Sequence, residues 1–73
     1  MNTTTIDDIA SRTSLMIEMA SWTLKQARDV ADSDSEHAQR LIAKVEGYAL
    51  AISVMADMSE RKVWAAISSK VES

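Results

Sequence analysis

The residues best suited to chemistry in this sequence are a single histidine and the carboxylates near it. Asp34 precedes His37 by three residues, the spacing of a metal-binding pair on one face of a helix. A di-metal helical bundle needs that pair twice, together with further inward carboxylates, and this sequence has it once. We therefore interpret His37 as a solvated residue at the start of a helix and predict no metal site.

Other forms of catalysis have equally little support in the sequence. Glu18 and Glu46 fall in the middle of predicted helices, and nothing places them in a shared pocket for acid–base work. No glycine-rich phosphate loop or nucleophile elbow is present. The remaining enzymatic alternative is a small helical mutase of the chorismate type, which would hold an anionic substrate through Arg12, Arg28, Arg40 and Lys44. The chain is short for such an enzyme, so we predict a protein without catalysis or cofactor.

The length of the chain predicts one small domain, residues 1–73, that needs additional stabilisation. A chain of this size buries only about 60% of the surface that its unfolded form exposes. It has no cysteine, so disulfides and thiolate metal sites are excluded. Association with another chain or very good helix packing must supply the missing stability.

The charge and the hydropathy of the chain argue against nucleic acid and membrane as partners. The net charge is −3 and the basic residues are scattered, whereas nucleic-acid binding needs a concentrated basic face. The amino-terminal residues lack the pattern of a signal peptide, and the longest apolar run is too short to span a bilayer. We predict a cytoplasmic protein that binds neither nucleic acid nor membrane.

Helix-forming residues dominate the sequence, which has no proline and one glycine, so we predict an all-α fold. The first helix, about residues 5–32, would begin with Thr5 and Asp8 in the manner of a capping box. Its apolar or small residues then recur at alternating steps of three and four, which is a heptad seam. The seam comprises Ile6, Ile9, Thr13, Met16, Ala20, Thr23, Ala27 and Val30.

A polar turn at residues 32–35 separates this helix from a second one, at about residues 34–57. Ser33 and Glu36 fit a capping box for the second helix. Because the connection is short, the two helices should pack as an antiparallel hairpin. The second helix continues the pattern with Ala38, Leu41, Val45, Tyr48, Ile52 and Met55.

The carboxyl-terminal segment, residues 58–72, permits two interpretations. Asp57 and Glu60 could cap a third helix, or the second helix could continue without a break. A continuous helix would extend well beyond the first one at about 1.5 Å per residue. In both cases its apolar stripe must fold back or meet another chain.

The segment GYALAISVMA, residues 47–56, is apolar on every side, so one hairpin partner cannot cover it. Its outward residues predict a homodimer that resembles a four-helix bundle. The predicted interface comprises Gly47, Leu50, Ala51, Val54 and Met58. In the alternative, the third helix covers this face and the protein is a compact monomer.

A second outward apolar patch predicts binding to a foreign protein, because large exposed apolar patches usually mark interaction sites. Leu15 and Trp22 are seven residues apart and lie opposite the seam, with Met19 beside them. Trp64 and Ile67 belong to the apolar stripe of the carboxyl-terminal segment. Tryptophan is enriched at binding hot spots, so we predict Leu15, Met19, Trp22, Trp64 and Ile67 as anchors.

One family resemblance covers approximately residues 20–62. Trp22, the polar turn from Asp32 to Glu36, the sequence EGYALAI at residues 46–52 and the ERK sequence at residues 60–62 resemble the phage-encoded quorum-sensing anti-activators of Pseudomonas. The resemblance implies a small dimeric helical hairpin that binds a LuxR-type transcription factor and a pilus-assembly ATPase and blocks both.

The predicted function is therefore that of a protein-binding regulator, an inhibitor or anti-activator of phage or mobile-element origin. It would act by occlusion, covering a functional surface of a bacterial target. The alternatives are a self-assembling structural protein and a protein that binds a small ligand, in addition to the mutase.

Overall fold

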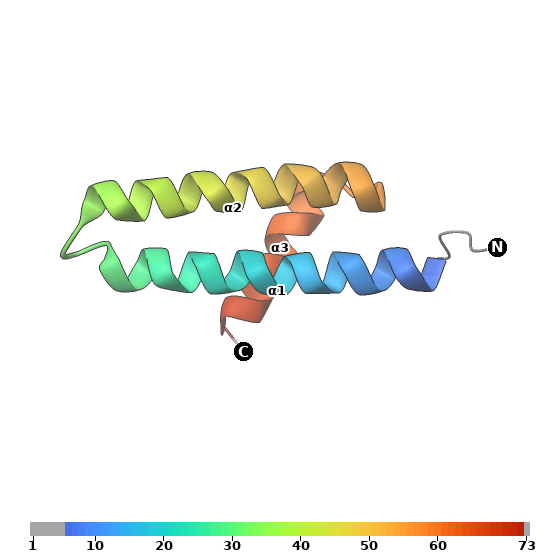
Figure 1. Cartoon of the computed structure of the whole chain (residues 1–73), viewed down its shortest axis with the longest axis horizontal. Helices are drawn as coiled ribbons and strands as arrows, with labels where there is room; N and C mark the ends of the chain where they lie inside the picture. Colours follow the sequence, from blue (N-terminus) through green and yellow to red (C-terminus); the bar gives the residue numbers. More distant parts are fainter. Residues whose placement is uncertain (1–5, 73) are drawn as a thin grey trace.

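The computed structural model describes residues 6–72, and this range contains three helices (Figure 1). They are α1 (Ile6–Val30), α2 (Ser35–Ala56) and α3 (Glu60–Glu72). Helices α1 and α2 lie side by side and antiparallel, joined by a short turn, and we call this pair the hairpin. The predicted all-helical fold is confirmed within the described residues.

The turn between α1 and α2 is closed by hydrogen bonds to the end of α1. The N–H groups of Ser33 and Asp34 donate to the Val30 carbonyl at 3.1 and 2.7 Å. Asp34 is the N-cap of α2, and its carboxylate accepts a hydrogen bond from the His37 N–H at 3.1 Å. The prediction that Ser33 caps this helix is wrong, since its hydroxyl donates to the Val30 carbonyl instead. The other predicted cap, Thr5, lies outside the described residues.

Between α2 and α3 the chain reverses sharply, so the carboxyl-terminal segment is a separate helix. Asp57 adopts the left-handed conformation (φ 54°, ψ 48°), and its N–H donates to the Ser53 carbonyl. Ser59 then caps α3, because its hydroxyl accepts a hydrogen bond from the Lys62 N–H at 3.3 Å. Of the two interpretations of residues 58–72, the third helix is confirmed, although Ser59 rather than Asp57 is its cap.

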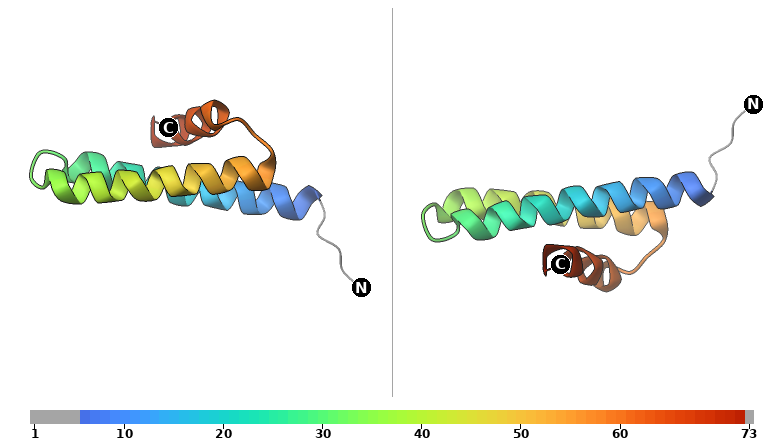
Figure 2. Two further views of the ribbon diagram at one scale, coloured as in Figure 1. Left: turned by 90° about the horizontal axis from the view of Figure 1, so that it is seen from above. Right: turned by 90° about the horizontal axis from the view of Figure 1, so that it is seen from below.

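Helix α3 crosses one face of the hairpin at a steep angle and leaves the other face uncovered (Figure 2). The core forms where the three helices meet. Its fully buried members are Ala20, Val45, Ala49, Ile52, Val63 and Ile67. The described side chains of both predicted seams are all buried or half-buried, so the heptad pattern identified the inner faces of α1 and α2 correctly.

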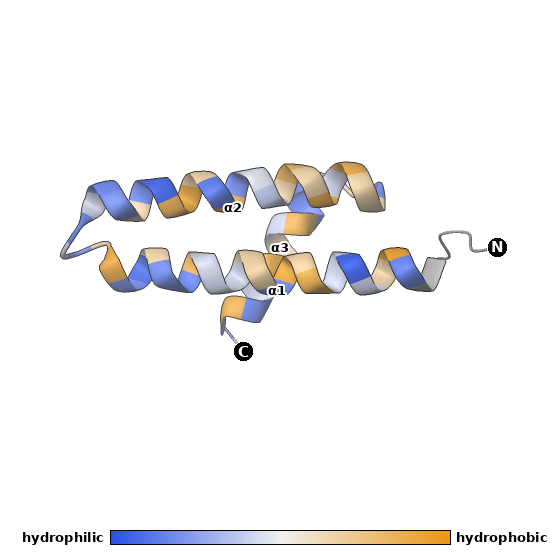
Figure 3. Ribbon diagram, viewed as in Figure 1, coloured by the Kyte–Doolittle hydropathy of each residue, from blue (hydrophilic) through white to orange (hydrophobic). Residues whose placement is uncertain are grey.

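Burial of apolar surface is the main force that holds α3 in place. Figure 3 shows that the carboxyl-terminal half of α2, next to α3, is more apolar than its amino-terminal half. Val63 and Ile67 of α3 are fully buried and Val71 nearly so. An ion pair between Lys70 and Glu18, with 3.7 Å between nitrogen and oxygen, also joins α3 to α1. Because both side chains are about half exposed, this pair contributes about 0–1 kcal/mol, less than the apolar contacts.

Candidate interaction surface

The outer face of α1 carries three large apolar side chains in a row. Leu15, Met19 and Trp22 follow the spacing i, i+4 and i+7, which places them on one side of a helix. They remain 57%, 44% and 68% exposed, respectively. We call these three residues the α1 patch. The structure therefore brings together three of the five residues predicted to anchor a partner.

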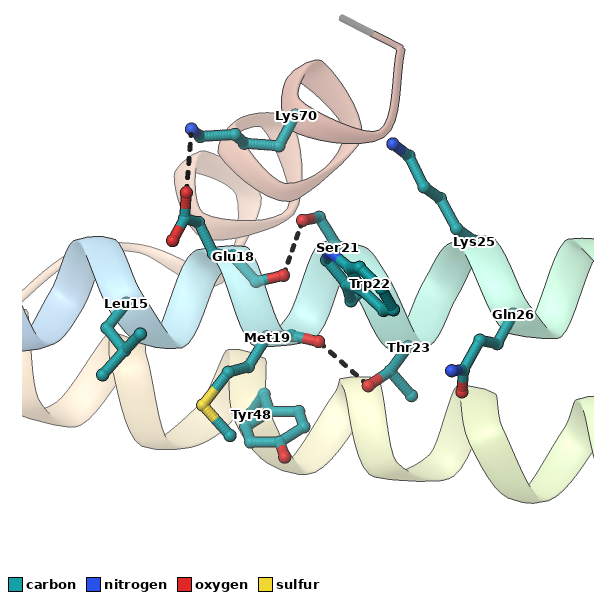
Figure 4. A pocket seen from close by; sticks show the side chains of 10 residues that line it. All are labelled: Leu15, Glu18, Met19, Ser21, Trp22, Thr23, Lys25, Gln26, Tyr48 and Lys70. Atoms are coloured by element: carbon teal, nitrogen blue, oxygen red, sulfur yellow. Dashed lines mark hydrogen bonds and ion pairs between the residues drawn. The ribbon is translucent and has the colours of Figure 1, made fainter.

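A shallow groove of about 570 Å³ surrounds the α1 patch (Figure 4). It is lined by Leu15, Glu18, Met19, Ser21, Trp22, Thr23, Lys25, Gln26, Tyr48 and Lys70. Met19 and Tyr48 lie close to one another on the side of α2, whereas Lys25 and Lys70 lie on the side of α3. The groove thus draws residues from all three helices, with α1 supplying most of them.

The polar groups of the groove differ in what they offer to a partner. The Ser21 and Thr23 hydroxyls donate to the carbonyls of Glu18 and Met19 in their own helix, at 2.8 and 2.9 Å. Lys25 and Gln26 are exposed at the rim. An apolar centre with a polar, solvent-accessible rim is the usual anatomy of a protein–protein interface.

A second apolar stripe runs along the outside of α2, and α3 does not cover it. Leu50 is 57% and Val54 77% exposed, and Gly47 and Ala51 are also exposed. We call these four residues the α2 stripe. A Cβ atom added at Gly47 would meet nothing within 4 Å, so packing within the chain does not require glycine there. The expectation that the third helix covers this face is wrong, because Leu50 and Val54 remain exposed while Val63 and Ile67 of α3 pack into the core.

Three residues predicted to lie at an interface are placed differently by the structure. Ile67 is 0% exposed and belongs to the core, so its assignment as a partner anchor is wrong for the folded chain. Trp64 and Met58 are half-buried and pack against the same core. All three are more buried than predicted for one reason. The carboxyl-terminal segment folds back onto its own hairpin instead of meeting another chain.

The residues considered for catalysis do not assemble into a site. Asp34 and His37 are joined by the helix cap, and no group of three or more potential metal ligands occurs among residues 6–72. The basic residues considered for a mutase are all exposed and none lines the groove. They are Arg12, Arg28, Arg40 and Lys44. The geometry therefore adds no support to the enzymatic alternative.

Several groove residues were not identified from the sequence. Lys25 and Gln26 follow Trp22 by three and four residues, so helical spacing could have placed them on the same face. Tyr48 was assigned to the seam, where it is half-buried, and it also reaches the groove. Lys70 lines the groove only because α3 folds back onto the hairpin, and no local signal in the sequence predicts that contact.

Comparison of the chain with protein-family models, with curated proteins and with solved structures finds no match. Within residues 6–72, no helix combines the length and the apolar character that crossing a membrane requires.

Proposed function

We propose that this protein is a non-enzymatic regulator that binds another protein through the α1 patch. The observation that carries the proposal is the exposure of Leu15, Met19 and Trp22 in one row beside a groove. In this proposal the protein is an inhibitor or anti-activator, and it covers a functional surface of its target.

The apolar side chains of the α1 patch can supply enough binding free energy for a specific complex. Truncation of a tryptophan at the centre of an interface commonly costs 2 kcal/mol or more, and Trp22 is 68% exposed before any partner binds. The patch lies on a helix of 25 residues that is already ordered, so little backbone entropy is lost on binding. A few anchors on a rigid helix can therefore supply most of the affinity.

The nature of the target is suggested by the family resemblance of residues 20–62. The candidate targets are a LuxR-type transcription factor and a pilus-assembly ATPase in a bacterial cytoplasm, and the protein would have a phage or mobile-element origin. Trp22 and the polar turn carry part of that resemblance. These two classes of target are the first to test.

Affinity capture from bacterial lysate tests the proposal with two variants matched in exposure and chemistry. Leu15→Glu places a charge in the α1 patch, and Val54→Glu places the same charge in the α2 stripe; both positions are more than half exposed, so both variants should fold. We expect wild type and Val54→Glu to capture the same host protein and Leu15→Glu to lose it. Equal capture by Leu15→Glu would contradict the proposal.

We also propose that a second copy of the chain packs against the α2 stripe, giving a dimer that resembles a four-helix bundle. Gly47 supports this proposal, because glycine inside an exposed helix is unfavourable and no contact within the chain accounts for it. Small residues such as Gly47 and Ala51 would let two helices approach closely. The same stripe favours the alternative in which the protein only assembles with itself, and a capture experiment without a foreign protein would support that alternative.

Gly47→Ala is expected to act in opposite directions on folding and on dimerisation. It should raise the free energy of unfolding of the monomer by about 0.5–1 kcal/mol, because alanine is the better helix former and the site is open. If Gly47 lies at a close helix contact, the added methyl group should weaken the dimer. Chemical denaturation at low concentration and analytical ultracentrifugation measure the two effects. A stabilised monomer with unchanged association would remove Gly47 from the interface.

A further inference from the structure

The hinge between α2 and α3 contains one residue, Asp57, in a left-handed backbone conformation. Asp57 is the only non-glycine residue with a positive φ in the described part of the chain. Most residues with a side chain avoid this left-handed region, although aspartate and asparagine adopt it more readily than the others. The Ser53 hydroxyl donates to the Met58 carbonyl at 2.6 Å and helps to close the turn. The chain thus turns between α2 and α3 without the glycine that commonly follows the end of a helix.

The sequence across this hinge is also compatible with an uninterrupted helix. Residues 48–72 contain neither glycine nor proline, and alanine, methionine, glutamate, arginine and lysine in this range favour helix. In such a helix Asp57 would have ordinary helical dihedral angles, and the turn would disappear. A short hinge loop favours the exchange of an element between identical chains.

An opened chain would expose two surfaces that fit each other. One is the stripe of α3, formed by Val63, Ile67 and Val71; the other is its docking surface on the hairpin, which includes Ala20 and Ile52. All of these residues are at most 9% exposed in the closed chain. A second opened copy presents the same pair of surfaces, so each α3 can regain its native contacts on the partner.

We propose that α3 exchanges between two copies of this chain, so that α3 of each copy packs on the hairpin of the other. The exchanged dimer keeps the contacts of Val63, Ile67 and Val71 with a hairpin and straightens both hinges. Lys70 belongs to α3 and lines the groove beside the α1 patch. In the exchanged dimer each groove is therefore completed by Lys70 from the other copy, and one particle carries two equivalent binding surfaces. This arrangement does not depend on the identity of the target.

The ion pair between α3 and α1 provides a test on the unmodified protein. A carbodiimide joins a lysine amine to a neighbouring carboxylate, and Lys70 Nζ lies 3.7 Å from the Glu18 carboxylate. Chains labelled with ¹⁵N and unlabelled chains would be unfolded together, refolded as an equal mixture at high concentration and cross-linked. Mass spectrometry then reads the isotopes of the linked Glu18 and Lys70 peptides. Glu18→Gln, which removes the reactive carboxylate, is the control for the assignment of the link.

Exchange predicts linked peptides of mixed isotope composition in the dimer fraction, together with the two uniform species. If every link joins peptides with the same label, α3 stays on its own hairpin and the proposal is overturned. A dimer that contains only uniform links would show that the copies associate without exchange of α3, as in the packing proposed for the α2 stripe.

Substitutions at Asp57 provide an independent measurement. Glycine adopts the left-handed conformation without strain and is a poor helix former, so Asp57→Gly favours the turn. Alanine disfavours the left-handed conformation and is the best helix former, so Asp57→Ala favours the continuous helix. We expect Asp57→Gly to weaken dimerisation and Asp57→Ala to strengthen it, each by roughly 25-fold, about fivefold for each of the two hinges. Light scattering over a range of concentrations gives the association constants. If the two variants have equal association constants, the proposal is overturned. This holds even where no cross-link forms and the isotope experiment gives no result.

Discussion

Replacement of Ile67 by alanine is expected to lower the free energy of unfolding by about 2–5 kcal/mol. Ile67 is 0% exposed and lies in the core with Val45, Ile52 and Val63, so the substitution leaves a cavity where three helices meet. A domain of this size is expected to have a total stability of roughly 4–11 kcal/mol. The loss therefore removes a large share of the total. Urea denaturation followed by far-ultraviolet circular dichroism measures it.

The control for this prediction is Leu15→Ala, which truncates an apolar side chain that is 57% exposed. We expect that change to alter the stability by less than about 1 kcal/mol, because most of the side chain already contacts water. If instead Ile67→Ala left the stability unchanged and abolished target binding, Ile67 would be an anchor and the packing of α3 described above would be incorrect.

The inner faces of the first two helices could be predicted because burial there follows one local rule. Apolar or small residues recur every three or four positions from Ile9 to Val30 and from Ala38 to Met55. A helix with such a stripe must bury it, and a short polar turn leaves only the neighbouring helix to do so. Side chains as different as Thr13 and Ile52 follow this rule, because position on the helix decides their burial more than residue type.

The position of α3 could not be predicted, because two local signals near the hinge compete. The segment around Asp57 has good helix formers on both sides and also potential caps at Asp57 and Ser59. The stripe of Val63 and Ile67 shows that this segment must be buried but gives no indication of the surface that buries it. This ambiguity led to the wrong assignment of Ile67 as an anchor.

The candidate interaction surface was predictable to the extent that it depends on one helix. Leu15 and Trp22 lie opposite the seam of α1 with Met19 beside them, and helical spacing alone places the three together. The groove around them also needs Tyr48 from α2 and Lys70 from α3. Those contributions depend on how three helices cross, which is a tertiary property that no spacing within a single helix encodes.

Replacement of Trp22 by alanine is expected to weaken binding of the captured target by roughly 30- to 1000-fold, which corresponds to about 2–4 kcal/mol. Trp22 is the most exposed side chain of the α1 patch and lines the groove. On binding it would lose more contact with water than any other residue of the patch. Because Trp22 is 68% exposed in the folded chain, the free energy of unfolding should change by no more than about 0.5–1 kcal/mol. Isothermal titration calorimetry and urea denaturation measure the two effects.

The matched control is Trp64→Ala, since these are the two tryptophans of the chain and they differ in burial. Trp64 is half-buried against the core, so its truncation should lower the stability by about 1–3 kcal/mol and affect binding only as far as α3 is loosened. Loss of binding without loss of stability at Trp22, and the reverse at Trp64, would separate the interaction surface from the core. Undiminished binding by Trp22→Ala would show that the target is held elsewhere, and the α2 stripe would then be the next exposed apolar surface to test.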